Sequence, residues 1–335
     1  MSLLFRFRDW KRHLTPYLSP IGVIFNCILL YLIIKKSTPA MKNFKNVFIF
    51  TCVLEMVFSA SMLVFVPTFT VVNGTYFCIS EGIFGPLPYS WTMMGCNWVT
   101  FILYSTVANS FVIFLYRFLI VCRNITLSSK QLFLCALVGW GIVISYCGII
   151  SYQFLTHIEV PETHAKLVSD HFLLNATYGR YVSCNVQHLI SYALYGATPI
   201  VTFAYVAIII MSIAVQYEFR NLQSMMSLEQ RRFHGEITIN LWIEALTPFV
   251  TVVLPIYYDI SKMIFQYMPC DWFAEFAWLL TLIGPSFTAT FKIMSIKAYR
   301  GEVFDVLYNT LIMKAPSGLY DSTCPPICDW RQSDA

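Results

Sequence analysis

The sequence predicts an all-α membrane protein that folds as a bundle of seven transmembrane helices. Its composition is the first observation: 57% of the 335 residues are hydrophobic and 12% are charged, whereas about 25% are charged in a typical soluble domain. The second is that apolar runs long enough to cross a bilayer recur along the whole chain. Most of the chain is therefore predicted to be embedded in membrane lipid. Basic residues form no stripe alternating with exposed aromatic residues, so nothing predicts nucleic acid as a partner.

Each predicted span has about 20 residues or more, the length that crosses the hydrocarbon core as a helix. The first span follows a charged tail, is too long for a signal-peptide core and lacks a small-residue cleavage site. We interpret it as an uncleaved anchor. The third and fifth spans are long enough to tilt or to extend beyond the lipid. The seven spans are residues 17–34, 47–68, 90–119, 132–154, 189–215, 237–258 and 272–296.

Positive charges predict the orientation, because Lys and Arg concentrate in cytoplasmic loops. The loops after the first, third and fifth spans and the C-terminal segment hold most of them, whereas the alternate loops hold only Lys166, Arg180 and Lys262. The N-terminus is therefore predicted outside, although the Arg and Lys residues of the first tail favour the opposite. We divide the chain into an extracellular tail 1–16, a transmembrane domain 17–299 and a cytoplasmic tail 300–335, largely disordered at its end.

The loops assigned to the outside are predicted to carry a disulfide and two glycans. Cys78, Cys96 and Cys184 lie on or near the outer face, where disulfides persist. A bridge from the third span to the long outer loop would join Cys184 with Cys96 or Cys78. The glycosylation sequons that begin at Asn73 and Asn175 both fall in these loops, which supports the topology.

No set of residues predicts catalysis or a cofactor. A hydrolase needs a nucleophile, a base and an orienting group at one depth, and the sequence contains no HExxH, GxSxG or phosphate-binding glycine loop. The eleven cysteines are scattered, without histidines at ligand spacing, so they do not predict a metal site. We expect neither an enzyme nor a bound metal or cofactor.

The sixth span, NLWIEALTPFVTVVLPIYY, combines an acidic residue with two prolines. Pro248 and Pro255 each remove a backbone donor, so a helix bends there. Glu244 is an intramembrane acid, a type of residue that faces the bundle interior, and Glu55 of the second span is predicted at the same depth. Either a hydrated functional cluster or a structural hydrogen-bond network explains these acids. Lys292 in the seventh span is expected to extend its amine to the inner surface.

Aromatic and polar residues gather near the predicted outer ends of the third, fifth, sixth and seventh spans. A ligand pocket lined by aromatic residues with a few polar anchors fits this pattern, and an interfacial aromatic belt fits it as well. The candidate ligand-binding residues are Trp91, Met94, Asn97, Tyr104, Tyr192, Tyr195, Tyr257, Tyr258, Glu275 and Trp278.

Several motifs recur in order over residues 16–300 and resemble the nematode serpentine chemoreceptors of the Str superfamily. The run GVIFNCILLYLIIKKSTPAMKNFKNVFIF resembles the family's first-span Asn, LLYLI exit and TP-x-M-x-x-(Y/F)-K inner loop. Tyr116-Arg117-Phe118 resembles the YR(Y/F) that ends the third span. Glu55 matches the acidic position of the second span, and the sixth-span pattern and the closing K-x-Y-R are also present. Within the superfamily, the Srd group is the closest match, partly through Asn73-Gly74-Thr75 and Gly85-Pro86.

The resemblance implies a rhodopsin-like receptor architecture in the plasma membrane, in sensory-neuron cilia. Its implied partners are a heterotrimeric G protein and a small environmental or pheromone-like ligand, which binds among the outer ends of helices 3, 5, 6 and 7 and moves helix 6. A transporter or ligand-gated channel with both acids in an ion path is the alternative. A polar residue usually precedes the seventh-span proline, where this chain has Gly284. The implied signalling residues are Asn26, Glu55, Tyr116, Arg117, Glu244, Pro248, Pro255 and Pro285.

Overall fold

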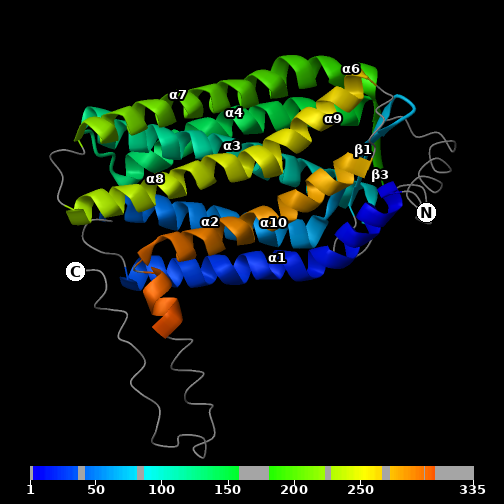
Figure 1. The fold of residues 1–335 in the computed structure, drawn as a ribbon. Coiled ribbons are helices and arrows are strands. Elements are labelled where there is room, and N and C mark those ends of the chain that lie inside the picture. Colours follow the sequence, from blue (N-terminus) through cyan, green and yellow to red (C-terminus); the bar gives the residue numbers. More distant parts are fainter. Residues whose placement is uncertain are drawn as a thin grey trace, which may run out of the picture.

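Seven long apolar helices form the molecule, and they confirm the predicted seven-transmembrane bundle. Figure 1 shows them running side by side, with a small sheet at the end of the bundle where the N-terminus lies. We call this the sheet end, and the other the opposite end. Which end faces the cell exterior stays a prediction. The computed structural model describes residues 3–36, 42–80, 87–157, 181–222, 228–265, 272–297 and 299–305.

Five of the spans are single helices, and two are interrupted by a π-helical turn. The fifth span consists of α6 (Val186–Tyr192), η2 (Ala193–Ala197) and α7 (Thr198–Leu222). The sixth consists of α8 (Leu228–Pro248), η4 (Phe249–Val253) and α9 (Leu254–Ile264). The single helices are α1 (Leu3–Lys36), α2 (Lys42–Phe65), α3 (Tyr89–Arg123), α4 (Ser129–Thr156) and α10 (Trp272–Ser295).

The first helix begins much earlier than the predicted boundary at residue 17. α1 is continuous from Leu3, and Arg8 and Lys11 within the expected tail are 7% and 2% exposed. Hydropathy alone assigns charged residues to water, because it takes no account of an ion pair with a carboxylate on another helix, here Glu275 on α10. The segment from Leu3 onward is therefore part of the bundle.

A three-stranded antiparallel sheet covers the sheet end, which the sequence analysis did not predict. Its strands β1 (Pro67–Val72), β2 (Thr75–Ser80) and β3 (Tyr181–Asn185) pair in that order. Asn73 and Gly74, both at positive φ, form the two-residue turn between the first two strands. Asn-Gly between alternating apolar residues is a strong hairpin signal.

Apolar side chains fill the bundle in two clusters. One lies under the sheet around Val99 and Trp278, and the other lies at the opposite end around Phe114 and Tyr299. Large apolar residues also cover the outside of the bundle, such as Phe203 at 71% exposed. A bundle with an apolar exterior is built for lipid rather than water, so the chain is a multi-pass membrane protein.

Candidate functional site

A cavity of about 100 Å³ lies between the sheet and the helices at the sheet end. The sheet contributes Phe69 and Tyr76, and α3, α9 and α10 contribute Tyr104, Asp259 and Trp278. Burial raises the pKa of the Tyr76 hydroxyl well above its ordinary value. Aromatic walls with a few polar groups are typical of small-molecule sites.

Three of the predicted ligand-binding residues line this cavity. Asn97 and Tyr104 lie seven residues apart on α3, so they share one face of the helix, and Trp278 faces them from α10. Tyr104 is 7% exposed and Trp278 is 5% exposed. Their role in ligand binding stays a proposal.

Four other predicted residues point elsewhere. Trp91 and Met94 lie on the outward stripe of α3 and are 57% and 48% exposed, and Tyr195 is 82% exposed. Tyr258 packs its ring on Phe273, with ring centroids 5.1 Å apart. None of these four lines the cavity in the described part of the chain. The exposed Trp91 and Tyr195 fit the alternative of an interfacial aromatic belt, which stays a prediction.

Two further predicted tyrosines bond between helices outside the cavity lining. Tyr192 accepts a hydrogen bond from Gln153 Nε2 on α4 at 3.0 Å. The Tyr257 hydroxyl lies 2.5 Å from Thr202 Oγ1 on α7, which joins the fifth and sixth spans. Both contacts position helices around the cavity rather than line it.

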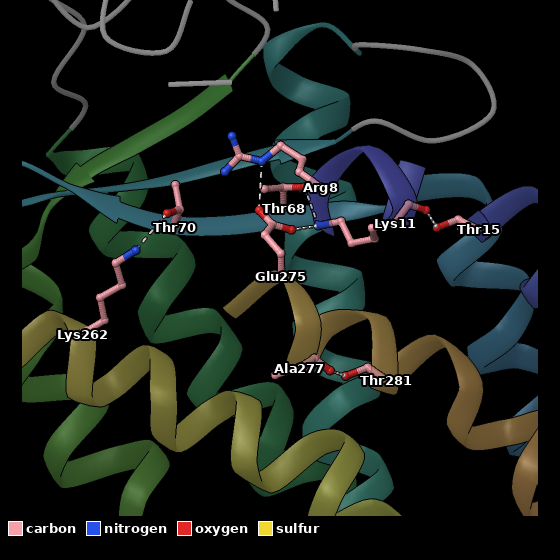
Figure 2. Close-up of polar contacts among 9 residues, drawn as sticks. All are labelled: Arg8, Lys11, Thr15, Thr68, Thr70, Lys262, Glu275, Ala277 and Thr281. Carbon is pink, nitrogen blue, oxygen red and sulfur yellow. Dashed lines mark hydrogen bonds and ion pairs between the residues drawn. The ribbon is translucent and has the colours of Figure 1, made fainter. Parts of the chain in front are cut away.

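Glu275 joins the start of α1 to α10 and the sheet, instead of facing the cavity. Its carboxylate accepts from Arg8 Nε at 2.9 Å and pairs with Lys11 Nζ at 2.8 Å, and Lys11 also donates to Thr68 Oγ1 on β1 at 2.7 Å. Figure 2 shows these side chains converging from three elements. We call Arg8, Lys11, Thr68 and Glu275 the sheet-end clasp. The ligand-anchor role predicted for Glu275 is thus replaced by a structural one, since two cations occupy its carboxylate.

A second buried ion network joins α3, α8 and α10, farther from the sheet than the clasp. Arg117 Nη2 on α3 donates to Glu244 Oε2 on α8 at 2.7 Å, and Lys292 Nζ on α10 reaches Glu244 Oε1 at 2.7 Å. Both cations lie over the Phe48 ring, 5.9 and 5.7 Å from its centroid. Tyr116, beside Arg117, is also buried. We call Arg117, Glu244 and Lys292 the core ion cluster.

Lys292 does not reach the surface as predicted. It is 3% exposed and paired with Glu244, because a carboxylate at its own depth is closer than water. Glu55 and Glu244 line a small cavity of about 20 Å³ together with Ser110, a volume of about one water molecule. The structure therefore brings the two predicted acids together at one depth.

The sixth span passes both prolines as a continuous but irregular helix. η4 begins directly after Pro248, and Pro255 stands in the first turn of α9. Proline cannot donate to the carbonyl four residues earlier, which for Pro255 is that of Thr251. Thr281 Oγ1 on α10 donates to the Thr251 carbonyl instead. Turns of π-helix inside α-helices occur frequently at functional sites.

The seventh span approaches this turn closely because it carries a glycine. A Cβ at Gly284 would lie 3.2 Å from Thr251 Oγ1 and 3.3 Å from its Cγ2. The departure from the family pattern at this position thus has a packing reason. The next residue, Pro285, offers its carbonyl to Asn26 Nδ2 at 3.3 Å, and Asn26 also donates to the Gly22 carbonyl at 2.9 Å. Asn26 and Pro285 therefore join the first and seventh spans.

The disulfide joins Cys78 with Cys96, which corrects the predicted pairing of Cys184. Cys78 on β2 lies beside the first turns of α3, whereas Cys184 on β3 pairs with Tyr76 of β2. The buried Cys184 thiol faces the Asn185 carbonyl at 3.7 Å.

The second sequon, at residue 175, lies outside the described residues. Within the described ranges, no group of three or more His, Cys, Asp or Glu is placed to hold a metal ion.

Asp259 belongs to the aromatic and polar residues near the outer end of the sixth predicted span, but it is absent from the set of candidate ligand-binding residues. Ile256, Asp259, Ile260 and Met263 all line the cavity, and their spacing of three and four residues defines one face of α9. An acid on the apolar face of a helix is the signal that could have identified it. The predicted span stopped at residue 258, so the face was cut one residue short.

Comparison with known proteins gives one result. The family model described as "Serpentine type 7TM GPCR chemoreceptor Str" matches residues 12–304. The match contains both cavities and the core ion cluster, whereas Arg8 and Lys11 precede it. Among curated proteins, none matches the sequence.

Proposed function

The chain belongs to the family of serpentine 7TM GPCR chemoreceptors, Str, and from this we propose how it works as a receptor. A small molecule binds in the sheet-end cavity, and the sixth span carries the signal to a heterotrimeric G protein at the opposite end. The sheet end faces outward from the plasma membrane, in agreement with the distribution of Lys and Arg. Location in a cilium and assignment to the Srd group rest on the resemblance alone.

One observation supports this function most: the sixth span contacts both sites. Asp259 on α9 lines the cavity, and Glu244 on α8 holds Arg117 and Lys292. The π-helical turn η4 lies between them. A change of cavity shape that rotates α9 is therefore positioned to alter the ion pairs on α8.

The ligand acts by binding the active arrangement more tightly than the resting one. In the resting arrangement Glu244 ties α8 to α3 through Arg117. In the active one α8 moves away from α3, and Arg117 becomes available to the G protein. Glu244 keeps Lys292 as a partner, so its charge is not left alone in the bundle.

The contacts of Glu244 also weigh against the transporter or channel alternative. An ion relay needs a carboxylate that can exchange partners with the passing ion, whereas two cations already hold Glu244. The cavity shared with Glu55 is about 20 Å³, which is the size of about one water molecule rather than a path.

The test measures signalling without any ligand, in cells with a promiscuous G protein reporter. Arg117→Ala is expected to abolish reporter activity at normal surface level, because Glu244 and Lys292 remain as a neutral pair. Glu244→Gln is expected to raise ligand-free activity, because it weakens the tie between α8 and α3. Arg6→Ala, at an exposed residue, is the control and should match the wild type. Full reporter activity in Arg117→Ala would refute the signalling role, and whole-cell current in cells that lack G proteins would favour the channel.

A further inference from the structure

The charge of the sheet-end cavity points to one class of ligand. Among the described residues that line the cavity, Asp259 is the one acidic or basic side chain. It stands on the inward face of α9, between apolar neighbours. An ionisable group inside a membrane bundle normally has a partner of opposite charge or a functional role.

The three buried cations that the structure describes at this end of the bundle contact other groups. Arg8 and Lys11 both pair with Glu275, and Lys11 also bonds to Thr68. Lys262 directs its amine to Thr70 Oγ1 on β1, at 3.5 Å, as Figure 2 shows. Lys262 and Lys11 are close enough to attract Asp259 electrostatically, and Glu275 repels it. In the described part of the chain, no ion pair within 4.0 Å is formed by Asp259.

The second polar group of the cavity wall stands beside this carboxyl group. The Trp278 side chain is 5% exposed, and its indole nitrogen interacts with Asp259 but meets no acceptor at full hydrogen-bond geometry. A buried N–H that is poorly bonded is costly. The cavity therefore presents an acidic group that lacks a cation, beside an indole N–H.

The aromatic walls of the cavity also favour a cationic ligand. Tyr76 and Tyr104 bring aromatic rings to the cavity, beside the indole of Trp278. Aromatic faces attract cations through their quadrupole, and Trp and Tyr do so well. A cationic ligand would therefore gain from the walls as well as from the carboxylate.

The volume limits the size of the ligand. A 150 Å³ apolar cavity holds a benzene molecule, so the cavity of about 100 Å³ holds roughly four to six non-hydrogen atoms by the same scale. Ligands this small bind no tighter than about micromolar, even at the best efficiency per atom.

We propose that the ligand of this receptor is a small protonated amine whose ammonium group pairs with Asp259 in the sheet-end cavity. The Trp278 N–H beside Asp259 and the aromatic walls complete the site around the ammonium group. The proposal rests on the proposed ligand-binding function of the cavity and deepens it.

The experiment uses the purified full-length receptor in detergent and measures its thermal midpoint, so it does not depend on G protein coupling. The probes are ethanolamine and propylamine, with the neutral ethylene glycol and butanol and the acidic propionate as size-matched controls, from micromolar to millimolar. Ethanolamine and propylamine are expected to raise the midpoint in proportion to binding. The neutral and acidic probes are expected to leave it unchanged.

Asp259→Asn tests the anchor, because it keeps the shape of the side chain and removes its charge. The apparent affinity for ethanolamine is expected to fall about tenfold or more, as on removing the charge of one partner of a buried pair. Asp9→Asn is the matched control, since Asp9 lies at the same end with its side chain 54% exposed, and it should bind as the wild type does. The midpoint without probe shows whether each variant folds.

Each outcome bears on the proposal. Equal stabilisation by butanol and propylamine, or undiminished ethanolamine binding in Asp259→Asn, overturns the amine assignment and leaves the cavity as a site for neutral molecules. No stabilisation by either amine also overturns it. In each case the ligand-free reporter test of Arg117 and Glu244 still decides on its own whether the chain signals as a receptor. Loss of folding in Asp259→Asn moves the test to Trp278→Phe, which removes the indole N–H beside Asp259 and is expected to weaken the binding of both amines; unchanged binding of both amines would overturn the assignment.

Discussion

The sheet-end clasp and the core ion cluster use the same arrangement of charges for different purposes. Each places one glutamate between an arginine and a lysine, at 2.9 and 2.8 Å in the clasp and at 2.7 and 2.7 Å in the core. The clasp joins the first turns of α1 to α10 and, through Thr68, to the sheet. The core cluster joins α3, α8 and α10 deep within the bundle.

The difference lies in what each glutamate is attached to. Glu275 stands near the beginning of α10, away from the irregular turns of the bundle. Glu244 stands one turn before Pro248 and η4, in the span that changes helical form. The clasp therefore joins α1, α10 and the sheet beside the cavity, whereas the core cluster holds the helix that we propose moves on signalling. In this proposal the irregular backbone beside Glu244, rather than the arrangement of charges, separates a switch from a structural contact.

Removing the core carboxylate should have the largest effect on stability. Glu244→Ala leaves Arg117 and Lys292 as two buried cations without their carboxylate, and we expect a loss of about 3–5 kcal/mol in unfolding free energy. Arg117→Ala or Lys292→Ala each leaves a neutral pair and should cost clearly less. Thermal or denaturant unfolding in detergent provides the measurement.

A charge-free cluster separates stability from signalling. The triple variant Arg117→Met, Glu244→Leu and Lys292→Met should recover most of the stability lost in Glu244→Ala, because well-packed apolar residues often replace a buried ion network at little cost. The same variant should give no reporter signal. A triple variant as unstable as Glu244→Ala would show that packing around Phe48, rather than charge, sets the cost.

Breaking the clasp should have a smaller effect on stability and a different effect on function. Glu275→Ala removes the carboxylate from Arg8 and Lys11, but Lys11 keeps Thr68 as an acceptor, so we expect a loss of about 2–3 kcal/mol. The contact of α1, α10 and the sheet beside the cavity should loosen, so ethanolamine should bind more weakly while ligand-free signalling stays at the wild-type level. Binding and reporter assays on the same preparation check this contrast. A rise in ligand-free signalling equal to that of Glu244→Gln would mean that both clusters act as switches.

The sequence predicted the large features of this fold because they depend on local composition. Seven apolar runs became seven spans, and the resemblance to the Str superfamily is confirmed by the family match. What it could not predict depends on partners that are distant along the chain. Lys292 was expected at the surface and Arg8 in a free tail, and both are buried because carboxylates from other segments meet them.

The candidate site shows the same limit at the level of single helix faces. Asn97 and Trp91 are close in sequence, yet one lines the cavity and the other faces outward, because α3 turns about 100° per residue. Both residues belong to the predicted ligand-binding set, because that set was chosen by residue type and position along the chain. The rotation of α3, which packs against α7, α4 and the sheet, separates them. The Asn-Gly turn is both a hairpin signal and part of a sequon, and only the hairpin signal predicts the strands.

The smallest predicted effect lies at the turn that separates the two clusters. Thr281→Val removes the hydroxyl that donates to the Thr251 carbonyl and should cost about 0.5–1.5 kcal/mol, the range for side-chain hydrogen bonds between membrane helices. Pro255→Ala should offset part of this loss, because residue 255 then has an N–H that can donate to the same carbonyl. Unfolding of the two single variants and the double variant gives the coupling energy directly. Additive effects would show that the carbonyl is satisfied in another way. A measurable coupling, together with a reduced response to ethanolamine in the double variant, would identify the proline and its threonine partner as the hinge between the clasp and the core ion cluster.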